Sequence, residues 1–297
     1  MARFIDPRVD WAFKRIFGSE DTKECLITFL NGLFEDELVI KDVTFAKTEK
    51  LGLRPDDRGV VFDVYCITNE GKHVIVEMQK KEQEYFADRA LYYTARAIVQ
   101  QGIRGIWDYH LAPVYTVCFM DFVSQSPMLK EFRTDLVLTD LQTRQRVSDR
   151  MRIVYLQLPL FDKHTEAECM DIFDCWIYIV KNMNMFEQMP FSEKYPVFRK
   201  LAEIGDLRKL SREELELYDE DIKNMRDIYA TRKFDEKKGM EIGMAKGMEK
   251  GMAKGMAKGM EKEKLATARR LLSMGLSDEQ VSTATELPLE EIQKMKE

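Results

Sequence analysis

The strongest constraint on the fold is a pair of apolar, alternating runs separated by a short turn. Residues 60 to 67 read Val-Val-Phe-Asp-Val-Tyr-Cys-Ile, and residues 73 to 79 read His-Val-Ile-Val-Glu-Met-Gln. Between them, Asn69-Glu70-Gly71 supplies residues typical of a tight turn. Runs of this composition joined by such a turn predict an antiparallel hairpin, and therefore a sheet-containing protein.

The register of this hairpin follows from its apolar positions. Side chains on a strand alternate between two faces, and in each run one apolar set falls on even numbers: Val60, Phe62 and Val64 in the first, and Val74, Val76 and Met78 in the second. We expect each run to place its even positions on one face and both sets to pack on one core. A turn centred on Glu70 then pairs residues whose numbers sum to 140. This register places Asp63 directly opposite Glu77.

Two carboxylates at opposed strand positions have Cβ atoms roughly 5 Å apart and destabilise the sheet unless a positive charge lies between them. A divalent cation would supply that charge. Hard oxygen ligands suit Mg²⁺ or Mn²⁺, which could acidify a water for attack on phosphorus. Gln79 shares the face of Glu77 and is the third candidate of the site, whereas Lys80 projects from the opposite face unless a bulge re-aims it.

The elements around the hairpin indicate the fold class. Two short helices are expected within residues 9 to 33, a strand at 38 to 48 and a helix at 83 to 101. Further strands are expected near 113 to 121, 134 to 140 and 151 to 158, followed by a mainly helical remainder from residue 163. This order predicts an α/β protein with a mixed central sheet flanked by helices.

The C-terminal third has a different character. Ser211 and Glu214 form a capping-box pattern ahead of a helix running towards residue 235. Residues 239 to 260 then repeat Gly-Met-x-x. Glycine at every fourth position costs about 1 kcal/mol each relative to alanine in a helix, so we expect a marginal helix or a flexible linker, ordered by self-association through its methionines. Within residues 264 to 297 we expect a small module of short helices, the second of which is capped by Ser277.

Charge and composition limit the function. The net charge is -6, and because the lysine-rich repeat is positive, residues 1 to 236 carry about -8. An acidic core binds DNA only through a local basic patch or bound cations.

The five cysteines form no CxxC pair, which indicates reduced thiols rather than a zinc site. The first residues do not form a secretory signal, and no run approaches roughly 18 apolar residues. We therefore expect a cytoplasmic protein without membrane contact.

Several ordered motifs resemble one known family. Asp63 followed by Glu77-Met78-Gln79 resembles the D…(D/E)xK pattern of the PD-(D/E)XK nuclease superfamily, with Gln in place of Lys. The opening Asp10-Trp11-Ala12-Phe13-Lys14-Arg15-Ile16-Phe17-Gly18, the segment Tyr85-Phe86-Ala87-Asp88-Arg89-Ala90-Leu91-Tyr92-Tyr93 and the glycine-rich tail are similar to the Rpn family of recombination-promoting nucleases, also described as transposases. The similarity covers nearly the whole chain.

This resemblance implies a restriction-endonuclease-like core with a helical C-terminal extension. The expected division is a nuclease core at 1–165, a helical extension packed on it at 166–236, a repeat linker or coiled helix at 237–262 and a helical module at 263–297. The implied activity is Mg²⁺-dependent cleavage of double-stranded DNA in recombination or mobile-element biology. Asp63 and Glu77 match the metal-binding acids. Gln79 matches the usual lysine, so either metal ions take over its task or activity is weak.

Other candidate residues have two readings each. Asp10 could approach the metal from the first helix or form an ordinary surface pair with Lys14. Arg89 and Arg96 are seven residues apart with Tyr92 between them, which predicts either a phosphate-holding face or a solvated stripe. Lys80 is a further candidate for substrate binding. The alternative function is a nuclease-fold protein that binds DNA or assembles through residues 239–260 with little or no catalysis.

Overall fold

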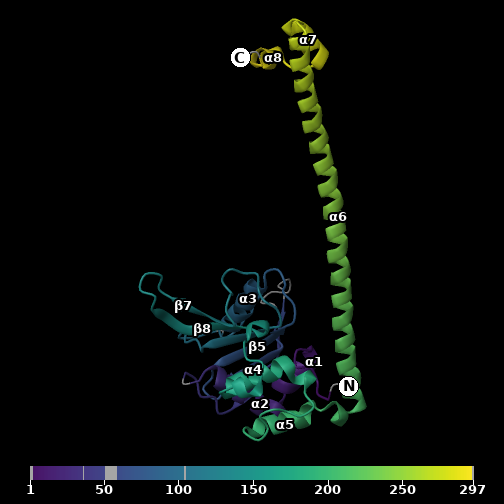
Figure 1. Ribbon diagram of the computed structural model, residues 1–297. Helices are drawn as coiled ribbons and strands as arrows, with labels where there is room; N and C mark the ends of the chain where they lie inside the picture. Colours follow the sequence, from purple (N-terminus) through teal and green to yellow (C-terminus); the bar gives the residue numbers. More distant parts are fainter. Residues whose placement is uncertain (1–2, 36, 51–58, 104, 296–297) are drawn as a thin grey trace. The chain divides into compact units, whose positions relative to one another are not determined.

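The computed structural model describes residues 3–35, 37–50, 59–103 and 105–295 (Figure 1), and the chain forms two compact units, Met1–Met225 and Arg226–Glu297. The first unit contains α1 (Asp10–Phe17), α2 (Lys23–Leu33), β1 (Val43–Phe45), β2 (Glu49–Lys50), β3 (Val60–Val61), β4 (Val64–Thr68), β5 (His73–Gln79), α3 (Phe86–Val99), β6 (Val114–Met120), β7 (Arg133–Thr139), β8 (Arg146–Gln157), α4 (Ile172–Asn182) and α5 (Pro196–Gly205). The long α6 (Arg212–Ser273) begins in this unit and continues into the second, where α7 (Asp278–Thr285) and α8 (Leu289–Lys294) follow.

The central sheet is mixed. Its six strands are ordered β1-β4-β5-β6-β8-β7, and a separate two-stranded sheet joins β2 to β3. Strands β5, β6 and β8 run parallel, whereas β1, β4 and β7 pair antiparallel with their neighbours. A parallel neighbour requires a crossover, and α3 is the crossover between β5 and β6. The expected fold class, a mixed sheet flanked by helices, is confirmed.

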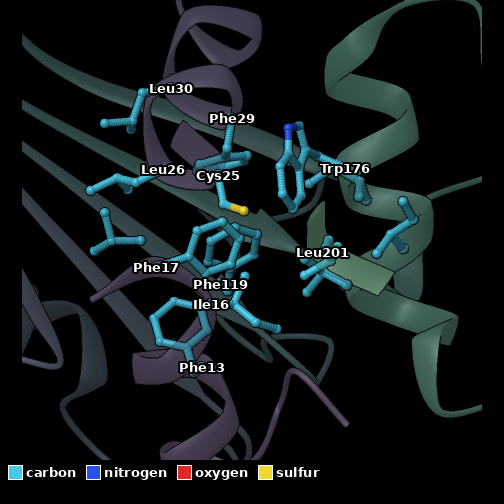
Figure 2. Packing of buried hydrophobic residues seen from close by; sticks show 14 of the residues in the cluster. Phe13, Ile16, Phe17, Cys25, Leu26, Phe29, Leu30, Phe119, Trp176 and Leu201 are labelled. Carbon is cyan, nitrogen blue, oxygen red and sulfur yellow. The ribbon is translucent and has the colours of Figure 1, made fainter. Parts of the chain in front are cut away.

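Helices cover both faces of this sheet. Figure 1 shows α3 on one side and α2, α4 and α5 on the other. On the side of α2 and α4, aromatic rings surround Phe119 of β6 (Figure 2): the ring centroid of Phe29 lies 5.0 Å away and that of Phe13 lies 5.7 Å away. Trp176 of α4 joins the same cluster through Phe17, at 5.5 Å. This cluster is the main core, and it fixes α1 and α2 against the sheet.

The predicted register of the hairpin is confirmed. Val64 pairs with Val76 and Ile67 with His73, so opposed residues sum to 140. The expectation of one continuous strand from 60 to 67 is wrong, however, because the chain breaks between β3 and β4. The amide of Phe62 donates to the carbonyl of Thr48 (3.0 Å), which continues the β2–β3 pairing.

The break changes the side on which Phe62 packs. Its ring contacts Tyr65 and Tyr93, at centroid distances of 5.2 Å and 5.5 Å, whereas Val64 packs in the main core on the opposite face. The expectation that these two even-numbered residues share one face is therefore wrong. Alternation holds only along an unbroken strand, and here the chain leaves one pairing partner for another.

The C-terminal repeat is helical. α6 runs without interruption through residues 239–260, so of the two expected states the helix is observed. Its predicted capping box is confirmed, since the amide of Glu214 donates to Ser211 Oγ (3.2 Å) and the amide of Ser211 to Glu214 Oε2 (2.8 Å). The second predicted box, at Ser277, is also present ahead of α7. Among the described residues, no helix is long and apolar enough to span a bilayer.

Two helical glycines should respond oppositely to alanine. A Cβ at Gly32 of α2 would lie 2.8 Å from Ile172 Cγ2 and 3.1 Å from the amide nitrogen of Phe173, whereas a Cβ at Gly255 of α6 would meet nothing within 4 Å. Gly32→Ala should therefore lower the unfolding free energy by about 1–3 kcal/mol through overpacking. Gly255→Ala should stabilise its helix by about 1 kcal/mol. Denaturant unfolding followed by tryptophan fluorescence and circular dichroism measures both, and a Gly32→Ala protein as stable as wild type would contradict the packing of α2 on α4.

Candidate metal and nucleic-acid site

Asp63 and Glu77 lie side by side at the break between β3 and β4. The backbone N–H of Asp63 donates to Glu77 Oε1 (3.2 Å), and the backbone N–H of Met78 donates to Asp63 Oδ2 (2.8 Å). The Glu77 carboxylate is thus held by the amide of Asp63, and the Asp63 carboxylate is held by the amide of the residue that follows Glu77. The two acids expected to meet across the hairpin do meet.

The strand break explains this arrangement. The β4–β5 ladder ends at the pair Val64–Val76, beyond which the β4 backbone no longer follows β5. The amide of Met78 would otherwise be a buried donor without a backbone acceptor, a state that costs about 1–3 kcal/mol. The Asp63 carboxylate accepts this hydrogen bond instead. An acceptor side chain at position 63 therefore stabilises the local fold.

The surroundings of the pair favour its protonated form in the absence of a cation. Burial raises the pKa of Asp63 to about 6, an effect opposed by the Met78 amide and increased by the charge of Asp10. Burial also raises the pKa of Glu77, which is only 6% exposed, well above its usual range, and the neighbouring Asp63 charge raises it further. Arg89 and Lys14 lower both pKa values. Burial of the pair and the closeness of its acidic neighbours thus outweigh the effect of these two cations.

Asp10 and Lys14 on α1 border this pair. Lys14 Nζ lies 2.7 Å from Asp10 Oδ2, so the surface pair expected from their spacing is present. Asp10 also lies close enough to raise the pKa of Asp63, so the two readings of Asp10 are compatible. The i, i+4 spacing predicts Lys14 only as a partner of Asp10, and the nearness of Lys14 to the acids was not predicted from the sequence. Its place in the same opening motif, one turn after Asp10, was the available signal.

The residues fit a hard divalent cation. Within the described part of the chain, no group of three or more His, Cys, Asp or Glu side chains is arranged as a complete metal site. The candidate centre therefore depends on the Asp63–Glu77 pair. Mg²⁺ typically takes one or two carboxylates and completes its shell with water and substrate phosphate, and the close carboxylates with raised pKa values supply such a donor set.

Gln79 connects the pair to α3. It is 9% exposed, and its Nε2 donates to the carbonyl of Lys81 (2.7 Å). Its Oε1 accepts a hydrogen bond from Arg89 Nη2. Arg89 Nη1 donates in turn to Gln83 Oε1 (2.7 Å). The residue in the place of the usual lysine thus binds an arginine ten positions further along the chain.

The remaining candidates lie differently. Arg96 is buried, at 6% exposure, so neither a phosphate-holding face nor a solvated stripe extends from Arg89 to Arg96; this part of α3 packs on the sheet. Tyr92 is 43% exposed. Lys80 projects away from Gln79, as alternation predicts, and its Nζ lies 3.7 Å from Asp6 Oδ2. The structure therefore brings together Asp63, Glu77, Gln79 and Arg89, with Asp10 beside them.

Comparison with known proteins bears on the identity of this site. The sequence matches a family described as PD-(D/E)XK nuclease family transposase over residues 7–233, from just before α1 into α6. No curated protein and no solved structure matches it significantly. The matched region contains the whole sheet and every candidate site residue, and it spans well over half of the sequence. The chain belongs to the PD-(D/E)XK nuclease family transposases.

Proposed function

We propose that this protein is a metal-dependent endonuclease that hydrolyses phosphodiester bonds of double-stranded DNA and acts in DNA recombination or in the movement of mobile elements. The observation that carries the proposal is the Asp63–Glu77 pair, which is held in place by backbone amides despite its mutual repulsion. Membership of a nuclease family supports the reaction class. A fold that keeps two such acids together at a cost in stability has a use for them.

The metal proposed for this pair is Mg²⁺, with Mn²⁺ as an alternative, because both ions prefer carboxylate and water oxygens. Asp63 and Glu77 would bind it directly, and Asp10, which pairs with Lys14 on α1, would act near the metal without forming a three-carboxylate site with them. When bound, such an ion lowers the pKa of a water and offsets the charge that develops on phosphate oxygens. The protein's own part is to hold the ligands and to keep Gln79 and Arg89 beside them.

DNA would meet the site on the side of α3. We propose that Arg89 and the part-exposed Tyr92 contact the substrate near the acids. Arg96 is buried and Lys80 faces Asp6, so these two candidates stay predictions without support from their surroundings. Because residues 1–236 carry about -8, bound divalent cations should contribute much of the attraction for DNA.

The cost of the acid pair gives a stability prediction. Because the folded-state pKa of Asp63 lies near 6, above its ordinary 3.8, the folded protein binds the proton more tightly than the unfolded chain does. Metal-free wild type should therefore lose stability as the pH rises from about 4 to about 6, and Glu77, whose pKa is also raised, should extend the loss to higher pH. Asp63→Asn removes the part of this loss that Asp63 contributes and should be more stable by about 1–3 kcal/mol at pH 7.

Thermal unfolding in EDTA at pH 4 to 8 tests this prediction. Addition of Mg²⁺ should stabilise wild type and leave Asp63→Asn unchanged. Glu70→Gln, which removes an exposed carboxylate from the turn between β4 and β5, is the matched control and should behave as wild type. An Asp63→Asn protein less stable than wild type in EDTA would show that the carboxylate is not under strain.

The activity itself is tested with supercoiled plasmid. Purified wild type should nick or linearise the DNA with Mg²⁺ or Mn²⁺ and should be inactive in EDTA. Asp63→Ala and Glu77→Ala should each reduce the rate by at least about 100-fold, since loss even of a group that only supports a metal ligand costs 10- to 100-fold. Glu70→Ala is the control. Plasmid that stays intact with either metal, or that the variants cut equally well, would favour the alternative of a non-catalytic DNA-binding protein.

The methionine repeat supports a proposal about the partner. Six methionines recur at every fourth residue of α6, and each is 62–75% exposed: Met240, Met244, Met248, Met252, Met256 and Met260. Side chains four residues apart form a ridge, and the glycines beside them form a groove. A second copy of the helix offers the matching groove and ridge. We propose that the protein forms a homo-oligomer through residues 239–260.

Light scattering tests this association. Wild type should have at least twice the monomer mass of 34.9 kDa, and deletion of residues 239–260 should give a monomer. Replacing the six methionines by glutamine is a sharper variant, because it removes the apolar ridge and keeps good helix formers. A mass that neither change alters would remove the proposed role of the repeat.

A further inference from the structure

Position 79 holds a neutral glutamine where the family pattern has a lysine. It follows Glu77 by two residues on the same strand and shares its face. The family pattern has a lysine there, as the K of its description states, and a lysine would place a positive charge beside the reacting phosphate. Gln79 has no charge. Phosphoryl chemistry increases negative charge on the phosphate oxygens, so some other cation is needed near this position.

The two polar ends of Gln79 are both used within the protein. Nε2 donates to the carbonyl of Lys81, and Oε1 accepts from Arg89. With only 9% of its surface exposed, Gln79 has little surface to offer a substrate, and both ends of its amide already have a partner within the protein. Its geometry is that of a side chain that positions another group.

Arg89 is restrained by four side chains. Besides Gln79, its guanidinium binds Gln83 Oε1, and the guanidinium carbon lies 5.3 Å from the ring centroid of Phe86 and 5.7 Å from that of Tyr93. A guanidinium has five N–H donors, more than these two glutamine contacts use. Such restraint lowers the conformational entropy lost when a phosphate binds.

The partners of Arg89 also leave its charge available. Both glutamines are neutral, and so are both rings. Lys14, the other cation near the acids, is different because Asp10 lies 2.7 Å from its Nζ and neutralises it by direct contact. Arg89 is held on the side of the acids by geometry, since its partner Gln79 lies two residues beyond Glu77 on the same face of β5. Of these two cations, Arg89 is the one poised for an anionic substrate.

We propose that Arg89 supplies the positive charge that a lysine at position 79 would supply, and that Gln79 is the positioning residue that holds the guanidinium beside the Asp63–Glu77 pair. This inference rests on the proposed nuclease function. It assigns to Arg89 a contact with the scissile phosphate during the reaction. It also gives the Gln in the (D/E)XK pattern a task that requires its amide oxygen.

A charge-relocation experiment tests the proposal on the full-length protein with a duplex oligonucleotide and Mg²⁺. Arg89→Gln should lower kcat by about 10²–10³, the usual effect of removing one donor that stabilises developing charge. Gln79→Ala should lower kcat less. The double variant Gln79→Ala/Arg89→Gln should be no slower than Arg89→Gln alone, because both changes remove one interacting unit.

The decisive variant is Gln79→Lys/Arg89→Gln, which moves the charge from α3 to β5. It should recover at least about tenfold of the activity lost in Arg89→Gln, a gain that a purely structural role of Arg89 would not produce. Arg144→Gln, which removes one charge from the exposed β7–β8 turn, is the matched control and should leave kcat unchanged. Equal melting temperatures would establish that each variant folds.

Binding gives a second readout. With Ca²⁺ in place of Mg²⁺, fluorescence anisotropy of a labelled duplex should show a salt dependence that is shallower by about one phosphate contact for Arg89→Gln, restored by the relocated lysine. Active wild type together with an equally active Arg89→Gln would overturn this inference and leave the nuclease function intact. A wild type without metal-dependent cleavage would instead overturn both.

Discussion

The rest of the site depends on the enforced closeness of two carboxylates. Asp63 and Glu77 are held by backbone amides at the point where β4 leaves β5, so turning one side chain away would break its hydrogen bond to the backbone. The energy for this arrangement must come from elsewhere. The aromatic cluster around Phe119 fixes α1 and α2 on the opposite face of the same sheet and is the evident source. The well-packed core thus covers one face of the sheet, and the acid pair lies on the other.

The crossover after β5 gives the site its cationic side. A parallel β5–β6 pair requires the chain to return over the sheet, and α3 does so directly after the acids. Its first turns therefore lie above Gln79. There Arg89 donates hydrogen bonds to the amide oxygens of Gln79 and Gln83 and packs near two aromatic rings. α1 contributes Asp10 and Lys14 from another side. Three segments of an acidic chain thus form one local site with both signs of charge.

The repeat helix of the second unit is not stabilised by a core of its own along residues 239–260, which are all exposed. Every fourth residue of its repeat is glycine, which weakens a lone helix, yet α6 is continuous through it. The methionine ridge is largely exposed, so the energy that orders such a helix in solution would come from burial against another surface. In the proposed homo-oligomer a second copy would supply that surface, because the ridge lies beside a groove of the same period. Oligomerisation would then bring two acid pairs into one assembly.

The sequence by itself determined the local features. Alternation and the Asn69-Glu70-Gly71 turn were enough for the register that opposes Asp63 and Glu77, and side-chain spacing was enough for the Ser211 and Ser277 caps, because these depend on neighbours within one or two elements. Tertiary structure decided the rest. The break that sends Phe62 to the other face, the burial of Arg96 and the bond between Gln79 and Arg89 arise from packing between separate elements. Periodicity reports which face a side chain takes on its own strand or helix, but not which side chain from another element it will meet.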